Sequence, residues 1–505
     1  MQTAMRKHWL DASPFSRITR RKSVRYPLAF LTGTALALSG CAVGPNYKPP
    51  AAASLGVPAT YTAAQGAPLS DAALADWWRG FNDPVLDGLI EQAIANNLDI
   101  AQGVARLDQA REALRQAGAS YLPNVSASGS GGRNFREGTT GSIVDANGNI
   151  IGGSSGGGSS NQYSGSLRAS WEIDLFGRIG RTVEATRADL AASGYSLANV
   201  RIAIIAETVS NYITARLSQE RLRIAREQLA TAQDNFNITR WRVEAGLVSS
   251  LDQEQARAQL AQQTAAIPQL EAGLANAFNR IAVLTGQAPG EATRALETAA
   301  PVPTAPTDIA TGIPADTLRQ RPDVRQAERT LAAATARIGV EQSALYPQLS
   351  LSGNIGTTAL SLGRLGDVIT GSLFGNLAQL IFDGGATASR VRAQEAAARG
   401  AFSAYKSTVL VALEDVENAL VADRNARARV TQLTIAVDAA NNSAIIARSQ
   451  YQAGLTDFQT LLTSEQSLLS ARDGLASARA DQVQAVAQLY SALGGGWQTM
   501  NGRPE

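Results

Sequence analysis

The stretch Tyr163–Arg178 reads YSGSLRASWEIDLFGR and decides the fold class of the chain. Its odd positions from 163 to 175 are apolar or small, and its even positions from 164 to 174 are polar. A period of two places the apolar side chains on one face of a β-strand and the charged side chains on the other. About ten tilted residues of this kind can cross a bilayer in a transmembrane barrel. The same pattern also suits a half-buried strand of a soluble sheet.

The segment that follows, from about 180 to 245, predicts one very long helix. It contains no proline, and apolar residues recur seven positions apart at Val183, Leu190, Leu197 and Ile204, and again at Leu222, Leu229, Phe236 and Val243. About 65 helical residues extend roughly 100 Å, which is far longer than the helices of ordinary globular domains. A short amphipathic strand joined to such a helix indicates a barrel that is continued by a helical tube.

The first 40 residues have the order of a secretory signal. Basic residues between Arg17 and Arg25 precede an apolar run from Pro27 to Leu38. The run is too short for a comfortable transmembrane helix. It ends with the sequence LSGC, which looks like a bacterial lipobox, with cleavage before Cys41 and lipid on its sulfur. The alternative is an ordinary signal peptide followed by a chance cysteine.

Composition excludes several kinds of chemistry from the processed chain. Residues 1–40 contain seven of the 45 basic residues and one of the 43 acidic residues, so the processed chain has a net charge of about −4. This balance gives no reason to expect nucleic-acid binding. His8 and Cys41 are the only histidine and cysteine, so His or Cys–His catalysis, His/Cys metal sites and an intrachain disulfide are excluded after processing. We therefore expect no enzyme, no metal site, and no cofactor beyond the lipid on Cys41.

The residues between the signal and the first long helix contain an extended segment and a helix. Residues 41–88 begin with an Ala/Pro/Gly-rich stretch, which predicts an extended tether. Trp77 and Trp78 can anchor this tether through the large area that they bury. A helix is expected from about 84 to 120, and Pro123 ends it.

The rest of the chain is a tandem duplication, which has to be interpreted as one architecture. Placing Asp99 on Asp323 aligns Pro123 with Pro347 without a gap. The first copy, 89–290, is expected to contain strands at 124–133 and 163–175 and long helices at 180–245 and 250–285. The second copy, 316–494, is expected to contain strands at 348–356 and 371–382 and helices at 386–452 and 457–493. A connector, 291–315, joins the copies, and 495–505 forms a carboxy-terminal tail.

Four strands cannot close a barrel, and open sheet edges cannot face lipid. Three copies supply twelve strands and a twelve-helix tube, which can close around a water-filled interior. The predicted fold class is therefore an α+β membrane protein. In it, a trimeric 12-stranded β-barrel with four strands per chain is continued by a 12-helix α-barrel.

Several short sequences carry a family resemblance over nearly all of the processed chain. They are GPNY at 44–47, WW at 77–78, SWEIDLFG at 170–177, AGL at 245–247 and 453–455, RPD at 321–323 and ALGGGW at 492–497. In this combination the chain resembles the TolC-like outer-membrane efflux proteins, specifically the lipoprotein (NodT-type) branch that serves RND multidrug pumps.

The resemblance implies a homotrimeric duct without catalysis of its own. It implies a β-barrel in the outer membrane of a Gram-negative bacterium, an α-barrel crossing the periplasm, and an equatorial segment around the middle, to which 41–88 would belong. The implied partners are a periplasmic membrane-fusion adaptor and an inner-membrane RND pump. The adaptor would engage the hairpin tips, which fall at Gly246, Leu247, Gly454 and Leu455.

The periplasmic aperture is where this chain departs from its family. Relatives often carry an aspartate just past the second tip, sometimes with an arginine three residues later. This chain has Thr463 and Gln466 at those two places, and Thr460 where some relatives have another aspartate. We therefore expect closure by packing and neutral hydrogen bonds rather than by an ionic latch. Asp252, Asp457 and Glu465 remain near the tips, either as solvated helix surface or as acidic rings in a trimer.

The function predicted first is passive export of drugs or other small molecules through the trimeric channel. Alternatives within the family are a duct for type I protein secretion or for metal-ion efflux. A more distant alternative is a lipid-anchored coiled-coil structural protein, against which the amphipathic strands argue.

Overall fold

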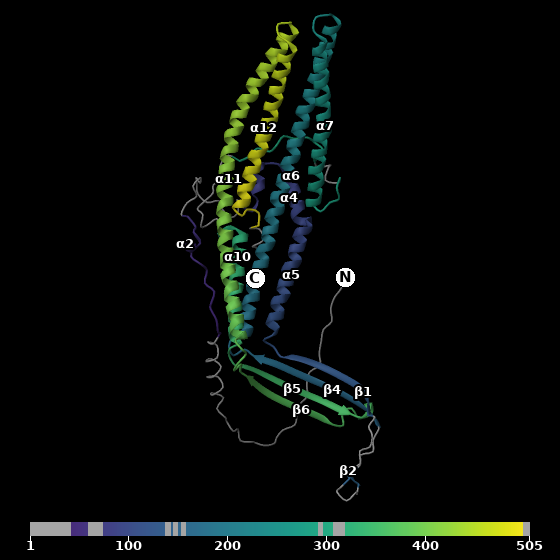
Figure 1. The fold of residues 1–505 in the computed structure, drawn as a ribbon, viewed down its shortest axis with the longest axis vertical. Coiled ribbons are helices and arrows are strands. Elements are labelled where there is room, and N and C mark those ends of the chain that lie inside the picture. Colours follow the sequence, from purple (N-terminus) through teal and green to yellow (C-terminus); the bar gives the residue numbers. More distant parts are fainter. Residues whose placement is uncertain are drawn as a thin grey trace, which may run out of the picture.

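The computed structural model describes residues 42–58, 74–136, 143–144, 150–152, 158–290, 296–306 and 319–497. The molecule is long, with a β-sheet at one end and two helical hairpins at the other (Figure 1). The predicted signal peptide, Cys41, more than half of the connector and most of the tail lie outside the described residues.

The two halves of the chain fold alike, which confirms the predicted duplication. In the first half α5 (Leu98–Ala119), β1 (Asn124–Arg136), β4 (Gly158–Ile173), α6 (Arg178–Glu244) and α7 (Ser250–Leu284) follow one another. The second half repeats this order with α10 (Pro322–Ser343), β5 (Gln348–Ala359), β6 (Ile369–Ala378), α11 (Ala386–Gln452) and α12 (Phe458–Ala492). Helices α6 and α11 have 67 residues each, and α7 and α12 have 35 each.

Four strands form one antiparallel sheet in the order β1-β4-β5-β6. Their ends differ from the predicted ones: β4 begins at 158 instead of 163, and β6 covers 369–378 instead of 371–382. Between β1 and β4, the strands β2 (Ile143–Val144) and β3 (Ile150–Gly152) pair as a short ribbon. Strands rich in Ser and Gly have weak propensity, so neighbouring strands rather than local sequence fix where they end.

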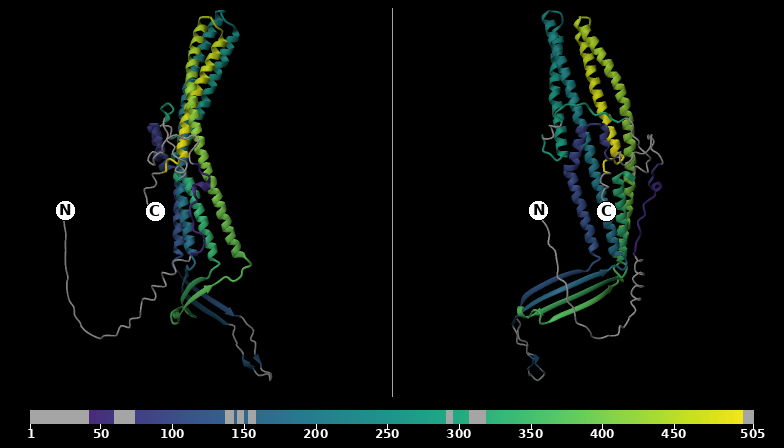
Figure 2. Two further views of the ribbon diagram at one scale, coloured as in Figure 1. Left: turned by 90° about the vertical axis from the view of Figure 1, so that its left-hand side faces the viewer. Right: turned by 180° about the vertical axis from the view of Figure 1, so that it is seen from behind.

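The long helices α6 and α11 extend from the sheet to the hairpin tips (Figures 1 and 2). Helix α10 packs against both of them and α5 packs against α6 in the part nearer the sheet, whereas α7 and α12 complete the hairpins in the part nearer the tips. Each half therefore supplies one continuous helix and one column built from two shorter helices. Helix α7 continues through Pro268. Among the described residues, no helix is long and apolar enough to span a bilayer.

The single helix predicted from 84 to 120 is wrong, because Asn97 divides it into α4 (Pro84–Asn96) and α5. Asn97 has an extended backbone (φ −66°, ψ 131°) and caps α5 by accepting hydrogen bonds from the amides of Asp99 and Ile100. Its buried side-chain amide donates to the Leu284 carbonyl at the end of α7 over 2.9 Å. A cap and a distant partner thus break a helix that propensity alone would continue.

The amino-terminal segment is extended, as predicted, but it is not a free tether. Arg181 at the start of α6 is 5% exposed and donates to the Val43 carbonyl, the Gly44 carbonyl and the Asn46 side chain over 3.1, 3.1 and 2.7 Å. Gly44 has a φ of +103°, and a Cβ on it would lie 2.5 Å from the Gly339 Cα. The segment therefore packs tightly between α6 and α10 before it reaches the short helix α2 (Ala52–Leu55).

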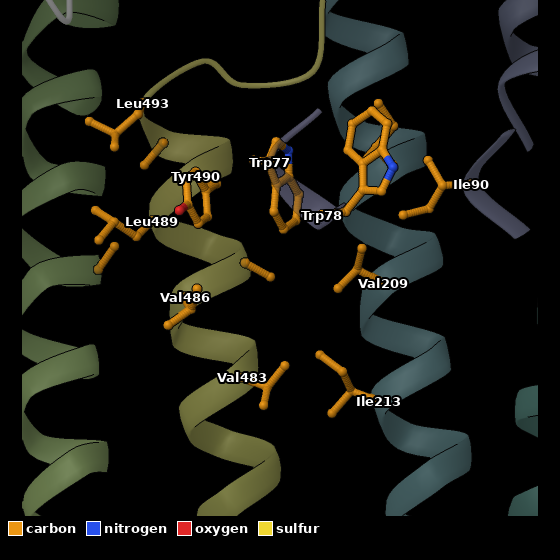
Figure 3. Close-up of a cluster of buried hydrophobic side chains, with 14 of the residues drawn as sticks. Trp77, Trp78, Ile90, Val209, Ile213, Val483, Val486, Leu489, Tyr490 and Leu493 are labelled. Carbon is orange, nitrogen blue, oxygen red and sulfur yellow. The ribbon is translucent and has the colours of Figure 1, made fainter. Parts of the chain in front are cut away.

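The largest core lies at mid-length, where segments from both halves of the chain meet. Trp77 and Trp78 belong to the 3-10 helix η1 (Trp77–Phe81) and are 3% and 2% exposed. The ring of Trp77 stacks on Tyr490 at 5.1 Å between centroids. Figure 3 shows these tryptophans beside α6 and α12, whose apolar side chains face one another below them. The same core includes residues of α4, α7 and α11.

The described part of the predicted tail packs beside this core. Trp497 is 5% exposed, and its indole nitrogen donates to the Gln320 carbonyl over 3.1 Å. The amide of Gly496 donates to the Leu74 carbonyl over 2.9 Å. The core thus connects the two ends of the described chain to both repeats. It also fixes the positions of the helical columns relative to one another along the long axis of the molecule.

Candidate functional site

The sheet has one apolar face and one polar face, and the strand register makes each face continuous. Leu167 lies opposite Ala127 on β1 and Ile355 on β5, and Trp171 lies opposite Leu351. The intervening positions are polar on all four strands: Ser126, Ser128, Ser130, Ser164, Ser166, Ser170, Ser350, Ser352, Asn354, Thr370, Ser372 and Asn376. One exception on the polar face is Phe374, which nothing in the structure explains.

Polar side chains also fix the junction between the sheet and α6. Glu172, the last charged residue of β4, accepts a hydrogen bond from the Arg178 Nε over 2.8 Å. Asp174 accepts from the amide of Gly180 over 2.7 Å, in the first turn of α6. Because a carboxylate at a helix N-terminus is favourable, this arrangement fixes the direction in which α6 leaves the sheet. The predicted strand pattern therefore continues directly into the predicted helix.

The two hairpin tips have the same backbone geometry. Gly246 and Gly454 have φ angles of +71° and +73°. The following residues, Leu247 and Leu455, donate from their amides to the Arg242 and Gln450 carbonyls over 2.8 and 2.9 Å. This is the Schellman arrangement, in which glycine takes the left-handed conformation that ends a helix. Leu247 and Leu455 are 69% and 78% exposed, so each tip presents an apolar side chain to solvent.

Side chains near the tips join the first hairpin to the second. Arg242 on α6 donates to the Tyr451 carbonyl on α11 over 2.7 Å, and its guanidinium carbon lies 4.6 Å from the centre of the Tyr451 ring. The Thr239 and Tyr451 hydroxyls are 3.1 Å apart. Farther from the tips, Arg221 donates to both carboxylate oxygens of Asp473 on α12. Sequence reasoning missed these contacts, because the partners are more than 200 positions apart.

The neutral residues predicted at the aperture lie on the exposed side of α12. Thr460, Thr463 and Gln466 are exposed, and Gln466 donates to Gln259 on α7 over 3.4 Å. Asp457 caps α12 by accepting from the Thr460 amide over 2.8 Å. Hydrogen bonds from Thr460 lower the pKa of Asp457, so this carboxylate stays ionised at neutral pH. Asp252 is in the first turn of α7, near the other tip.

Glu465 is not on that exposed side, so the expectation that it lines an aperture is wrong. It is 4% exposed and accepts from Asn235 on α6 over 2.6 Å and from Arg448 on α11 over 2.8 Å. Two helical turns along α12 separate it from Asp457, and the helix turn directs it into the bundle. A buried carboxylate needs such partners. Glu465 therefore joins α12 to both long helices.

Comparison with known proteins identifies the architecture. The family model described as "Outer membrane efflux protein" matches residues 89–287 and 313–495. The chain belongs to the outer membrane efflux protein family. It is 34% identical to "Nodulation protein T" of Rhizobium leguminosarum bv. trifolii, over 85% of this chain and 88% of that protein. It is 30% identical to the "Probable efflux pump outer membrane protein TtgC" of Pseudomonas putida, over 94% and 97% of the two chains.

Solved structures of this family share the fold described above. The outer-membrane channel OprN superposes with a TM-score of 0.79 at 33% identity, covering 91% of this chain and all of the other. The open state of the Neisseria gonorrhoeae MtrE outer membrane channel superposes with a TM-score of 0.77 at 25% identity. The predicted TolC-like membership and fold are thereby confirmed. As a member of the outer membrane efflux protein family, this chain is an outer-membrane exit channel for efflux.

Proposed function

We propose that three copies of this chain form a closed duct that passively exports small molecules across the outer membrane. The sheet carries this proposal, because it has an apolar face for lipid, a polar face for water and two unpaired edges. Strands β1 and β6 are these edges. Edges exposed to lipid leave backbone groups without partners, so β6 of one copy is expected to pair with β1 of the next. Twelve strands then enclose the lumen.

The helical part supports a duct that continues through the periplasm. Helices α6 and α11 have 67 residues each, enough for about 100 Å. Their tips present Leu247 and Leu455, which offer a partner two apolar contacts per protomer. A periplasmic membrane-fusion adaptor is the proposed partner at the tips, and an inner-membrane RND-type pump is the proposed energy source. The relative TtgC is called an efflux pump outer membrane protein, in agreement with this assignment.

The proposed location is the outer membrane of a Gram-negative bacterium, with lipid on Cys41 as a second anchor. The segment from Ala42 to Asn46 supports this anchor, because Arg181 fixes it at the end of α6 that joins the sheet. A lipid attached just before Ala42 is therefore close to the membrane. No further cofactor and no catalytic step are proposed. The relative TtgC is named as an efflux pump outer membrane protein, and OprN is named as an outer-membrane channel.

The proposed aperture lies at the exposed side of α12 near the second tip. Thr460, Thr463 and Gln466 offer hydroxyl and amide groups there, and the Asp457 carboxylate already caps its own helix. Closure in the resting trimer is therefore assigned to neutral contacts between protomers. In this assignment Asp252, in the first turn of α7 at the other hairpin tip, takes no part in closure.

Export can be tested in a strain that lacks its own outer-membrane efflux channels. The chain is expressed together with a matching adaptor and RND pump, and accumulation of a fluorescent dye substrate is measured. Dye accumulation is expected to fall only when all three proteins are present. Unchanged accumulation, combined with secretion of a protein substrate or with increased tolerance of metal ions, would instead assign the duct to one of those cargoes.

A further inference from the structure

Arg168 is a charged residue on the polar face of the sheet, and it has no partner among the described residues. It lies on β4, directly opposite Ser126 on β1 and Asn354 on β5, and its side chain is exposed. It forms no hydrogen bond or ion pair with any described residue. Its neighbours along the strand on the same face, Ser166 and Ser170, are neutral. The guanidinium is therefore an isolated positive charge on a surface of hydroxyl and amide groups.

The acid nearest to Arg168 on this face is already paired. Glu172 is four residues farther along β4, or roughly 13 Å at about 3.3 Å per residue. Arg178 donates to it over 2.8 Å from its Nε and also bonds its second carboxylate oxygen. Glu172 therefore contributes little field at Arg168. Arg133 on β1 is also charged. It lies on the apolar face, where it donates to Ser159.

The position of Arg168 along β4 places its charge well inside the membrane. Five residues separate it from Ile173, where the strand ends beside the helices. At about 3.3 Å per residue and a tilt of about 40°, this distance corresponds to a height of roughly 13 Å. The apolar band of such barrels is about 25 Å tall. Arg168 is therefore near the middle of the band, far from both openings of the barrel.

We propose that Arg168, repeated three times, forms a ring of positive charge that makes the barrel lumen favour anionic solutes. This inference rests on the proposed trimeric duct. Rings of arginine are a known way for a pore to favour anions. Twelve strands about 4.8 Å apart and tilted by about 40° close a barrel of roughly 12 Å backbone radius. Because the side chains extend inward, a solute on the axis passes closer than this to each guanidinium.

The field of this ring depends strongly on salt. The Debye length is about 10 Å at 0.1 M ionic strength and about 3 Å at 1 M. At 0.1 M the three charges therefore act on the whole cross-section of the lumen, whereas at 1 M they act only near the wall. The predicted substrate class is small anions, such as carboxylates, sulfonates and phosphates, which enter the barrel more readily than cations of the same size.

A single cysteine on the lumen face can measure this potential without depending on the state of the aperture. The variant Ser170→Cys has its thiol two residues from Arg168 on the same face, and Cys41 is the only other cysteine. Trimers in intact outer membranes are treated from outside with an anionic sulfonatoethyl or a cationic trimethylammonium-ethyl thiosulfonate. The two modification rates are compared, and the chain without Ser170→Cys provides the background.

Arg168→Gln in this variant is expected to lower the anion-to-cation rate ratio about three- to tenfold at 0.1 M salt and less than twofold at 1 M. Arg168→Lys keeps the charge and should keep the ratio. Arg133→Gln is the matched control, since it removes the same charge from the opposite face and should leave the ratio unchanged.

Two results would overturn the inference, and they are distinguishable. If Ser170→Cys reacts readily but the ratio is the same with Arg168 and with Arg168→Gln at 0.1 M, the ring of charge is rejected while the duct remains. If Ser170→Cys reacts with neither reagent, the polar face is not a water-filled lumen, and the proposed function fails together with the inference.

Discussion

At the scale of single residues, Arg181 joins the amino-terminal segment to the helical bundle. Its buried guanidinium donates to three acceptors of the amino-terminal segment and pairs with Glu184 over 2.7 Å. An arginine can do this because it presents five donors in a fixed fork. Removing it leaves the half-buried Val43 and Gly44 carbonyl groups without these donors, and polar groups withdrawn from water cost free energy when they are unsatisfied. Arg181 therefore makes three of the hydrogen bonds that hold the segment preceding α2, and the Tyr47 hydroxyl adds one to Glu328 over 3.1 Å.

Arg181→Ala is expected to release residues 42–58 from the bundle. The loss of its hydrogen bonds should cost roughly 2–4 kcal/mol of local stability. Limited proteolysis followed by mass spectrometry should detect faster cleavage within 42–58, with the helices unchanged. The matched control is Arg187→Ala, because Arg187 is exposed one turn and a half farther along the same helix. Equal cleavage rates for both variants would show that Arg181 does not hold the segment.

Cys41→Ser tests the lipid anchor. The change should abolish incorporation of a clickable fatty acid into the protein, because the sulfur that would carry the lipid is gone. A single acyl chain binds membranes only marginally, so firm anchoring needs more than one chain. Trimers are expected to persist, since the barrel holds the protein in the membrane independently. Unchanged fatty-acid labelling of the serine variant would reject the lipobox assignment.

Residue roles of this kind were only partly predictable from sequence. The glycines at the tips could be found, because the AGL sequence occurs in both copies at the ends of long proline-free segments. Arg181 and Glu465 could not, because Asn46, a partner of Arg181, and Asn235, a partner of Glu465, are 135 and 230 positions away along the chain. Glu465 points into the bundle and Thr463 points to solvent, although only two positions separate them. The sequence alone does not indicate which side of this helix faces the bundle.

At the scale of elements, the strands carry the division between lipid and water. Leu167 is 52% exposed on the apolar face, although it is a large hydrophobic residue. Such exposure is unfavourable in water but favourable against lipid. The two faces of β4 were predictable, because apolar or small residues alternate with polar residues without a break along this one strand. The ends of β4 and β6 were not predictable, because pairing with neighbours extends one and shortens the other.

Leu167→Arg is expected to lower the yield of assembled protein. An arginine on the lipid face near mid-membrane costs roughly 2–4 kcal/mol. Ser170→Arg introduces the same side chain three residues away on the polar face, where water can hydrate it. The amounts of trimer in isolated outer membranes should therefore differ severalfold. Similar amounts for both variants would contradict the assigned faces of the sheet.

Helix α12 carries the predictions about closure. In the proposed closure, the exposed Thr460, Thr463 and Gln466 make neutral hydrogen bonds between protomers, each worth about 1 kcal/mol, whereas charge-assisted bonds are about twice as strong. An exposed ionic latch weakens as salt screens it, and a neutral one does not. Single-channel conductance, divided by bulk conductivity, is therefore expected to stay nearly constant as ionic strength rises.

Two variants separate the neutral closure from an ionic one. Thr463→Ala should raise the open probability in planar bilayers, because it removes a hydroxyl from the exposed side of α12. Asp457→Ala should act mainly through loss of the helix cap. A steep rise of normalised conductance with salt in the wild type, together with opening by Asp457→Ala alone, would assign the gate to acidic residues.

At the scale of the whole molecule, the core at mid-length is where helices of both repeats pack together. Trp77, Trp78 and Tyr490 pack with helices from each half, so the amino-terminal segment and the carboxy-terminal residues join the same cluster. The duplication and its long helices were predictable, because a repeated pattern specifies one architecture twice. The division of a helix at Asn97 was not, because its cause is a hydrogen bond to Leu284 on a distant helix.

The central claim is that separate chains close one barrel through the sheet edges. Within one protomer, β1 and β6 are separated by β4 and β5, so they cannot exchange hydrogen bonds. In a ring of three chains, β1 of one chain and β6 of the next must exchange hydrogen bonds. Side chains that point to the same face then lie side by side on the two paired strands. A disulfide between them requires Cα atoms closer than about 7 Å, which only an edge-to-edge pair provides.

The most direct test is a cysteine scan across this edge. Ser128→Cys on β1 is combined with a cysteine at each position of β6 from Ile369 to Leu377, and the protein is oxidised in outer membranes. The account predicts covalent dimers and trimers but no larger species, with the highest yields at every second position of β6. Monomers alone at all positions, or a ladder that continues beyond three chains, would contradict a closed barrel of three copies.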